Sequence, residues 1–137
     1  MRIVRVVLGV VTALLLVGVA TCVAGEQTEV ARLRSFDERG VVHETKLWVV
    51  DQEDGTWVRV ARPERQWFKR LRENPEIEII REGAAPRKLR ATPDLSTDTK
   101  LRIDRAFRAK YGIVDWWYGV VLRSNPIPVR LEAAPPV

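Results

Sequence analysis

Four basic side chains, spaced three or four residues apart, make the part of this sequence best suited to hold a negatively charged ligand. They are Arg59, Arg62, Arg65 and Lys69. Arginine suits a phosphate group because its planar guanidinium donates two hydrogen bonds at once. The spacing therefore indicates a phosphate clamp, although a run of charge is also typical of a solvated strand edge and helix face.

Tryptophans accompany this basic run. Trp57 lies two residues before it, Trp67 lies within it, and Trp116 and Trp117 follow later in the chain. Their flat rings could stack on an aromatic ligand and line a groove for it. Large aromatic side chains also commonly fill a core or a subunit interface, so the sequence leaves both roles open.

Other site chemistry is not indicated by the sequence. The chain has one histidine, His43, and one cysteine, Cys22, which together cannot supply the ligand spacing of a metal site. Glu76 and Glu78 alternate along a strand and do not form a paired general acid and base. We therefore predict no metal site and assign no catalytic residue.

The elements that must position these residues begin with a hairpin. Residues 47–50 and 56–61 have the apolar content of strands, and Asp54-Gly55 is a turn signal between them. A helix is expected over 65–74, because Asn74 precedes Pro75 and is pushed out of helical geometry.

The rest of the chain alternates between strands and helices. Alternating apolar residues predict the strands, and apolar residues three and four apart predict the helices. Strands are expected at 76–81, 87–92 and 127–131, and helices at 99–110 and 115–122.

The N-terminal residues predict a targeting or anchoring segment. Arg2 and Arg5 precede an uncharged run over 6–24, and a helix of this length would extend about 28 Å, close to the thickness of a hydrocarbon core. Basic residues at the start favour a cytoplasmic N-terminus. We expect a single membrane anchor over 1–25 with an extracytoplasmic domain. Secretion after cleavage of a signal peptide behind Ala24, and a lipoprotein modified at Cys22, are the alternatives.

Length and charge limit the class of protein. We expect a linker or short amphipathic helix over 26–40, one domain over 41–133 and a loose tail over 134–137. The net charge is +5, and it falls to +3 when Arg2 and Arg5 are set aside. Because nucleic-acid-binding domains concentrate a larger excess on one face, we do not expect a nucleic-acid partner.

Several phrases in this order resemble a known superfamily. They are LWVV at 47–50, WVRVARPERQWFKRLRENPEIEI at 57–79, IDRAFRAKYG at 103–112 and RSNPIPVRLEA at 123–133. Together they resemble the deazaflavin-dependent nitroreductases and their short uncharacterised relatives, which belong to the pyridoxamine-phosphate-oxidase-like, flavin-binding superfamily. The resemblance covers residues 45–133.

The resemblance implies an α+β, mainly β fold: a six-stranded split β-barrel with two or three short helices, here preceded by an N-terminal hydrophobic helix. It also implies a homodimer and a bound FMN or deazaflavin. Arg59, Arg62, Arg65 and Lys69 would meet the phosphates, and the ring would lie near Trp57 and Trp67. The implied activity is hydride transfer to a small acceptor such as a nitroaromatic or quinone. The alternative is a non-catalytic barrel, without cofactor, that binds a ligand or partner at the membrane.

Overall fold

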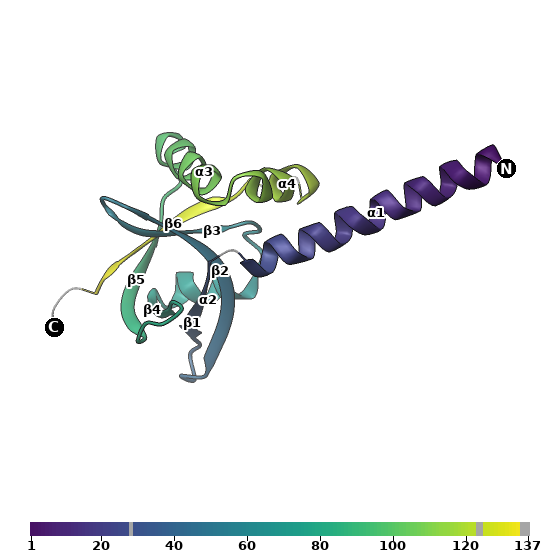
Figure 1. Ribbon diagram of the computed structural model, residues 1–137. Coiled ribbons are helices and arrows are strands. Elements are labelled where there is room, and N and C mark those ends of the chain that lie inside the picture. The colour runs from purple at the N-terminus through teal and green to yellow at the C-terminus, as the bar shows by residue number, and fades with distance from the viewer. Residues whose placement is uncertain (28, 123–124, 135–137) are drawn as a thin grey trace.

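A closed barrel of six antiparallel strands forms the body of this computed structural model, which describes residues 1–27, 29–122 and 125–134 (Figure 1). The order around the barrel is β1-β2-β3-β6-β5-β4, so the last strand closes it by pairing with both β3 and β5. The strands are β1 Val30–Phe36, β2 Val42–Gln52, β3 Gly55–Val60, β4 Glu76–Ile80, β5 Arg87–Pro93 and β6 Ile127–Ala133.

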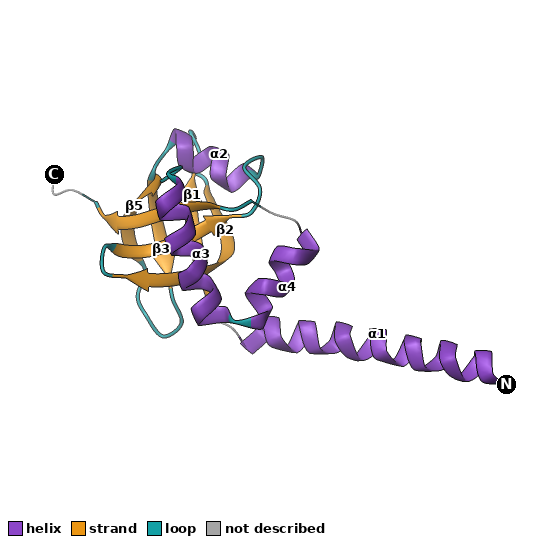
Figure 2. Ribbon diagram, turned by 90° about the horizontal axis from the view of Figure 1, so that it is seen from above, coloured by secondary structure: helices purple, strands orange, loops and turns teal. Residues whose placement is uncertain are grey.

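In the described residues, four helices accompany the barrel: α1 Arg2–Gln27, α2 Gln66–Glu73, α3 Thr97–Tyr111 and α4 Ile113–Leu122. Helices α3 and α4 lie on one side of the barrel, and α1 projects away from it (Figures 1 and 2). This architecture confirms the expected six-stranded split barrel with short helices and an N-terminal apolar helix. Arg123 of the closing motif and residues 135–137 of the expected tail lie outside the described residues.

Alternating side chains fill the barrel with aliphatic groups. In β3, Val58 and Val60 point inward and are fully buried. Helix α2 adds its apolar face to the same cluster through Trp67, Phe68 and Leu71. The interior of the barrel is therefore a packed core, and a ligand site must lie outside it.

A second apolar cluster covers the outer surface of β2 and β3. Val50 and Trp57 pack there with Ile103, Phe107 and Tyr111 of α3. Trp57 is consequently 2% exposed even though its neighbour Val58 faces the interior of the barrel. Helix α3 is thus packed on the sheet, and it also contacts α4.

Residues 26–40 differ from the sequence prediction of a linker or short amphipathic helix, because they contain strand β1. Ala31, Leu33 and Ser35 point into the barrel, whereas Arg32 and Arg34 point outward. The strand pairs with β2 on one side and β4 on the other. Pairing with two neighbouring strands satisfies the backbone hydrogen-bonding groups along β1. These hydrogen bonds outweigh the weak local preference for a helix that the spacing of its larger apolar residues indicates.

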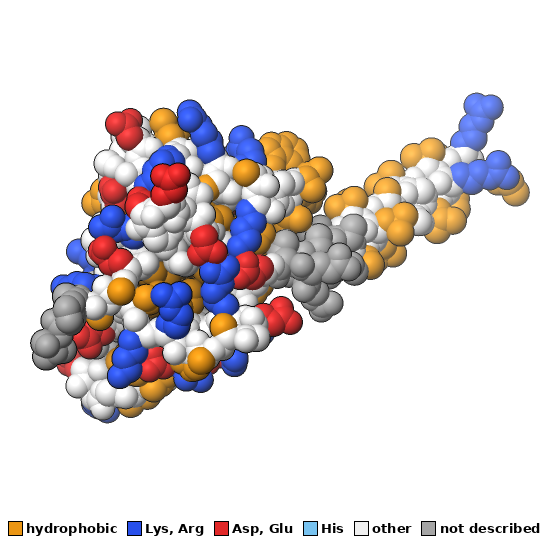
Figure 3. Space-filling model, turned by 60° about the vertical axis from the view of Figure 1, so that its left-hand side comes forward, with side chains coloured by type: hydrophobic (Ala, Val, Ile, Leu, Met, Phe, Trp, Pro, Cys, Tyr) orange, Lys and Arg blue, Asp and Glu red, His pale blue; other side chains and the backbone are white. Residues whose placement is uncertain are grey.

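The described side chains of helix α1, those of residues 2–19, take no part in the core. Its window Arg2–Val19 has a mean hydropathy of 2.2 and none of it is buried. The space-filling view shows hydrophobic side chains along this helix and at the edge of the body next to it, whereas the face toward the viewer mixes positive and negative charges (Figure 3). The helix is long and apolar enough to cross a membrane or to serve as a signal.

Candidate functional site

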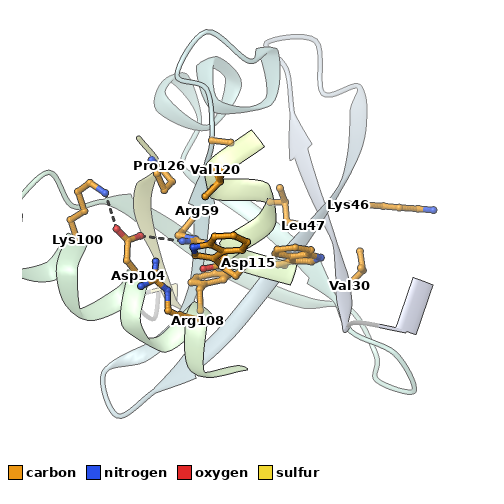
Figure 4. Close-up of a pocket in the computed structure, with 15 residues that line it drawn as sticks. Val30, Lys46, Leu47, Arg59, Lys100, Asp104, Arg108, Asp115, Val120 and Pro126 are labelled. Carbon is orange, nitrogen blue, oxygen red and sulfur yellow. Dashed lines mark hydrogen bonds and ion pairs between the residues drawn. The ribbon is translucent and has the colours of Figure 1, made fainter. Parts of the chain in front are cut away.

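A cavity of about 660 Å³ lies between the outer surface of β2 and β3 and helices α3 and α4 (Figure 4). Helix α3 covers the sheet at β2 and β3, whereas α4 diverges from it, and the cavity is the space between them. Its lining residues are Val30, Lys46, Leu47, Trp48, Arg59, Ala61, Lys100, Asp104, Phe107, Arg108, Asp115, Trp116, Gly119, Val120 and Pro126.

Arg59 forms the floor of this cavity. One guanidinium nitrogen, Nη1, donates to Asp104 Oδ1 at 3.1 Å, and Nη2 donates to Asp115. The guanidinium carbon also lies 4.0 Å from the centre of the Phe107 ring, as in a cation–π contact. The Arg59 side chain is 16% exposed, so two carboxylates and an aromatic face fix its position. Arg59 therefore shapes the site through its ion pairs.

The remaining charges give the cavity a positive balance. Of the lining side chains that the structure describes, four are cationic and two are anionic. Lys100 Nζ donates to Asp104 at 2.8 Å, one helical turn away. Lys46 and Arg108 are exposed and form no ion pair with a described residue. Lys46 points away from the other lining side chains, so Arg108 is the cation of this pair that can contact an anionic group on a ligand in the cavity (Figure 4).

The rings of Trp48 and Phe107 line one side of the cavity, and Tyr111, which is not a lining residue, stacks on both. Trp48 and Tyr111 stack with their centroids 4.7 Å apart and their planes 13° from parallel. Phe107 continues the stack, with its centroid 5.8 Å from that of Tyr111. Trp116 of α4 also lines the cavity and is 49% exposed. Flat walls of this kind suit a planar ligand.

The Tyr111 hydroxyl ties this wall to the start of the barrel. It accepts a hydrogen bond from Val49 N at 3.0 Å and lies 2.8 Å from Val49 O and 3.0 Å from Glu29 O. Val49 lies just beyond the last β1–β2 pair, so the hydroxyl takes the place of a missing strand partner. Burial raises the pKa of Tyr111, which keeps the phenol protonated and able to donate.

An ion cluster holds the junction between α1 and β1. The Glu29 carboxylate accepts hydrogen bonds from Lys110 and from Arg81, and Arg81 also contacts Asp51 Oδ2 at 2.8 Å. Burial by itself would raise the pKa of Glu29, but the hydrogen bonds from Lys110 and Arg81 outweigh it and hold that pKa below its ordinary value. Glu29 is therefore anionic at neutral pH. Its contacts with Lys110 and Arg81 connect the start of β1 to α3 and to the end of β4.

The structure separates the six site residues expected from the sequence, and only Arg59 lines the cavity. Trp57 is buried under α3, where its Nε1 donates to Asp54 Oδ1 at 2.8 Å. Trp67 is buried with the barrel interior. The other three, Arg62, Arg65 and Lys69, are exposed on the β3–α2 loop and on α2.

Sequence reasoning missed most of the cavity. Asp104, Arg108 and Asp115 were not singled out, because charged residues on a helix are usually solvated. One signal was present for Asp115, since it is the only charged residue in α4 and an isolated charge in an apolar helix needs a partner. Trp116, proposed from the sequence as a possible ring-stacking residue, does line the cavity.

His43 lies away from the cavity. Its Nε2 is 3.0 Å from Asp37 Oδ2, near the turn between β1 and β2. Among the described residues, no group of three or more histidine, cysteine, aspartate or glutamate side chains is arranged to hold a metal ion.

Comparisons with known proteins identify the fold. No family model and no curated protein sequence matches the chain. The structure is similar to that of HutZ, the heme storage protein from Vibrio cholerae, with a TM-score of 0.62 and 14% identity over 82% of this chain and 87% of that one.

Two further crystal structures share the same barrel. One is a putative pyridoxamine 5'-phosphate oxidase from Listeria innocua, with a TM-score of 0.57 and 16% identity over 80% of this chain and 87% of that one. The other is a FAD-binding protein from Mesorhizobium loti, with a TM-score of 0.58 and 15% identity over 80% of this chain and 83% of that one. The chain thus has the split-barrel fold of the pyridoxamine-phosphate-oxidase type, which confirms the resemblance at the level of the fold.

Proposed function

We propose that this protein is a membrane-tethered split barrel that binds a flavin-type ring, FMN or deazaflavin, in the cavity between the barrel and helices α3 and α4. The observation that carries the proposal is the cavity itself. Its volume of about 660 Å³ falls within the range of small-molecule sites. It also combines an aromatic wall with cations that have no described carboxylate partner.

The cavity residues fit such a ligand in a definite way. Trp116, which is 49% exposed, would stack against the planar ring, and Trp48 would form part of the wall beside it. Arg108 would donate charge-assisted hydrogen bonds to a phosphate group, whereas Lys46 points away from the cavity (Figure 4). Arg59 would hold the floor rigid through its two ion pairs. When bound, a reduced ring of this type supplies hydride transfer to a small acceptor such as a nitroaromatic or quinone.

A non-catalytic ligand-binding module is the second candidate, and the ion pairs of the cavity favour it. Asp104 and Asp115, the two lining carboxylates, are both engaged by Arg59, so neither is free to act as a general acid or base. Among the described lining residues, none carries the imidazole, thiol, thioether or phenol that ligates haem iron, so these residues suit a flavin better than haem.

The tether is the second part of the proposal. Helix α1 would span the bilayer with Arg2 and Arg5 on the cytoplasmic side, which places the barrel outside the cytoplasm. Protease added to intact cells should then digest the barrel, whereas protection until the cells are lysed would contradict this orientation.

Ligand binding is tested with the full chain in nanodiscs, by titrating FMN and oxidised deazaflavin and following tryptophan emission. Arg108→Ala removes one charge-assisted hydrogen bond and should weaken binding about tenfold. Arg62→Ala and Arg65→Ala are the matched controls, because they remove exposed cations outside the cavity. Weakening in these controls, with Arg108→Ala unaffected, would instead support the basic run predicted from the sequence.

Turnover separates the two candidates. Chain loaded with reduced cofactor is mixed with a soluble quinone, and reoxidation of the ring is followed by absorbance. Oxidation faster than that of free cofactor supports an oxidoreductase. Tight binding with no acceleration supports the non-catalytic module, and the absence of binding to either cofactor refutes the flavin proposal.

A further inference from the structure

Helix α4 turns its apolar side outward and its only charge inward. Ile113, Trp116, Trp117 and Val120 follow the i, i+3, i+4, i+7 spacing of a single helical stripe. They are 77%, 49%, 38% and 54% exposed, respectively, whereas Asp115 on the opposite side is 8% exposed. A surface helix in contact with water has the reverse arrangement. We refer to these four outward residues as the α4 stripe.

The position of α4 relates the stripe to α1. The two helices are in contact, and Figures 1 and 2 both show α4 beside the C-terminal end of α1. The apolar window Arg2–Val19 is about 27 Å long as a helix, close to the thickness of a hydrocarbon core. When this window spans the bilayer, residues 20–27 lie at the headgroup level, and α4 lies beside them.

The chemistry of the stripe matches that level of a membrane. Tryptophan is enriched at the boundary between headgroups and hydrocarbon, because its ring is apolar and its N–H group is polar. The exposed guanidinium of Arg108, which shares the cavity with Trp116, can contact lipid phosphates. Hydrophobic side chains also gather at the edge of the body next to α1 (Figure 3).

We propose that α4 lies in the headgroup layer of the membrane that α1 enters, with Trp116 and Trp117 as its anchors. This inference rests on the tethering by α1 in the proposed function. Because Trp116 and Val120 belong both to the α4 stripe and to the cavity lining, the cavity then opens at the membrane surface. Its substrate class is therefore an acceptor dissolved in the bilayer, such as a lipid-soluble quinone.

The test uses the full chain in vesicles whose phosphatidylcholine carries bromine near the headgroup end of its acyl chains. Bromine quenches tryptophan on contact, so wild-type emission should fall relative to vesicles of unbrominated lipid. Most of this quenching should disappear when Trp116→Phe is combined with Trp117→Phe, which preserves aromatic shape. Trp67→Phe is the matched control, because Trp67 is buried in the barrel, and should leave the quenching unchanged.

Three results would overturn the inference. Equal quenching of the wild type and the double variant would show that α4 lies outside the bilayer. Accessibility of Trp116 and Trp117 to aqueous iodide in nanodiscs that hold one copy, with protection only in discs that hold two, would show that a second copy covers the stripe. Release of the chain from vesicles by alkaline carbonate would refute the tether and the inference together, whereas retention combined with equal quenching refutes the inference alone.

Discussion

Replacing Arg59 with methionine tests the electrostatic floor of the cavity. The substitution keeps an unbranched chain of similar apolar length and removes the charge. Asp115, which is 8% exposed, then loses the guanidinium that neutralises it. Asp104 still contacts Lys100 and is 31% exposed, so it contributes little to the loss. Removing one partner of a buried pair costs about 3–5 kcal/mol, and the residual exposure of Arg59 places the expected loss at about 3 kcal/mol.

This loss is measurable, since a domain of this size has an unfolding free energy of about 5–15 kcal/mol. The assay is urea unfolding of the full chain in a mild non-ionic detergent, followed by tryptophan emission. Adding Asp115→Leu to Arg59→Met should recover most of the loss, because no buried charge is left unpaired. The exposed Arg62→Met is the matched control and should change the stability by less than about 0.5 kcal/mol.

The reasoning would be refuted by either of two results. One is a loss below about 1 kcal/mol for Arg59→Met, which is the value of a solvent-exposed ion pair. The other is a double variant no more stable than Arg59→Met alone, since the cost would then not come from the uncompensated carboxylate of Asp115.

The other predictions concern the junction and the barrel. Tyr111→Phe leaves the buried Val49 N–H without its partner and should lower the unfolding free energy by about 1–3 kcal/mol in the same urea assay. The folded-state pKa of Glu29 is lowered, so the ionised carboxylate stabilises the fold above its unfolded-state pKa, and this stabilisation is lost on acidification below about pH 4. Glu29→Gln should therefore reduce the pH dependence of the unfolding free energy below about pH 4. Gly55→Ala should cost about 1–3 kcal/mol, because φ is +130° and its Cβ would approach a backbone oxygen to 3.2 Å, whereas Gly119→Ala has open space and should not destabilise.

Each of these predictions has a result that would contradict it. An unchanged urea midpoint for Tyr111→Phe would mean that water replaces the hydroxyl. If the unfolding free energies of Glu29→Gln and wild type fell identically at acidic pH, the loss of stability would come from other carboxylates. Equal stability of the two glycine variants would mean that the β2–β3 turn relaxes without strain.

Period-two and helix-end signals predicted most of the barrel. Val58 and Val60 were expected on one strand face, and both point into the core. Asn74 and Gly112 were expected to end helices, and each is the C-cap residue of its helix. These signals are local, because proline geometry and the left-handed conformation of glycine act within one or two residues.

The remainder depends on contacts that local patterns do not contain. Strand β1 was missed because Ala31 and Ser35 are weak strand formers, and only pairing with β2 and β4 gives them an interior position. The partnership of Arg59 with Asp115 joins residues 56 positions apart in the sequence. No periodicity within β3 indicates that α3 and α4 will cover its outer surface, so the basic run was interpreted either as a phosphate clamp or as a solvated strand edge and helix face.

The place of β6 in the barrel has a consequence for biosynthesis. Strand β6 is inserted between β3 and β5. Until β6 is synthesised, one edge of β3 and one edge of β5 therefore have unpaired backbone N–H and C=O groups. Chains that terminate before Ile127 would keep both edges open and should recruit chaperones or aggregate. The cell's quality-control machinery would therefore recognise the unpaired edges of β3 and β5 until β6 has paired with both strands.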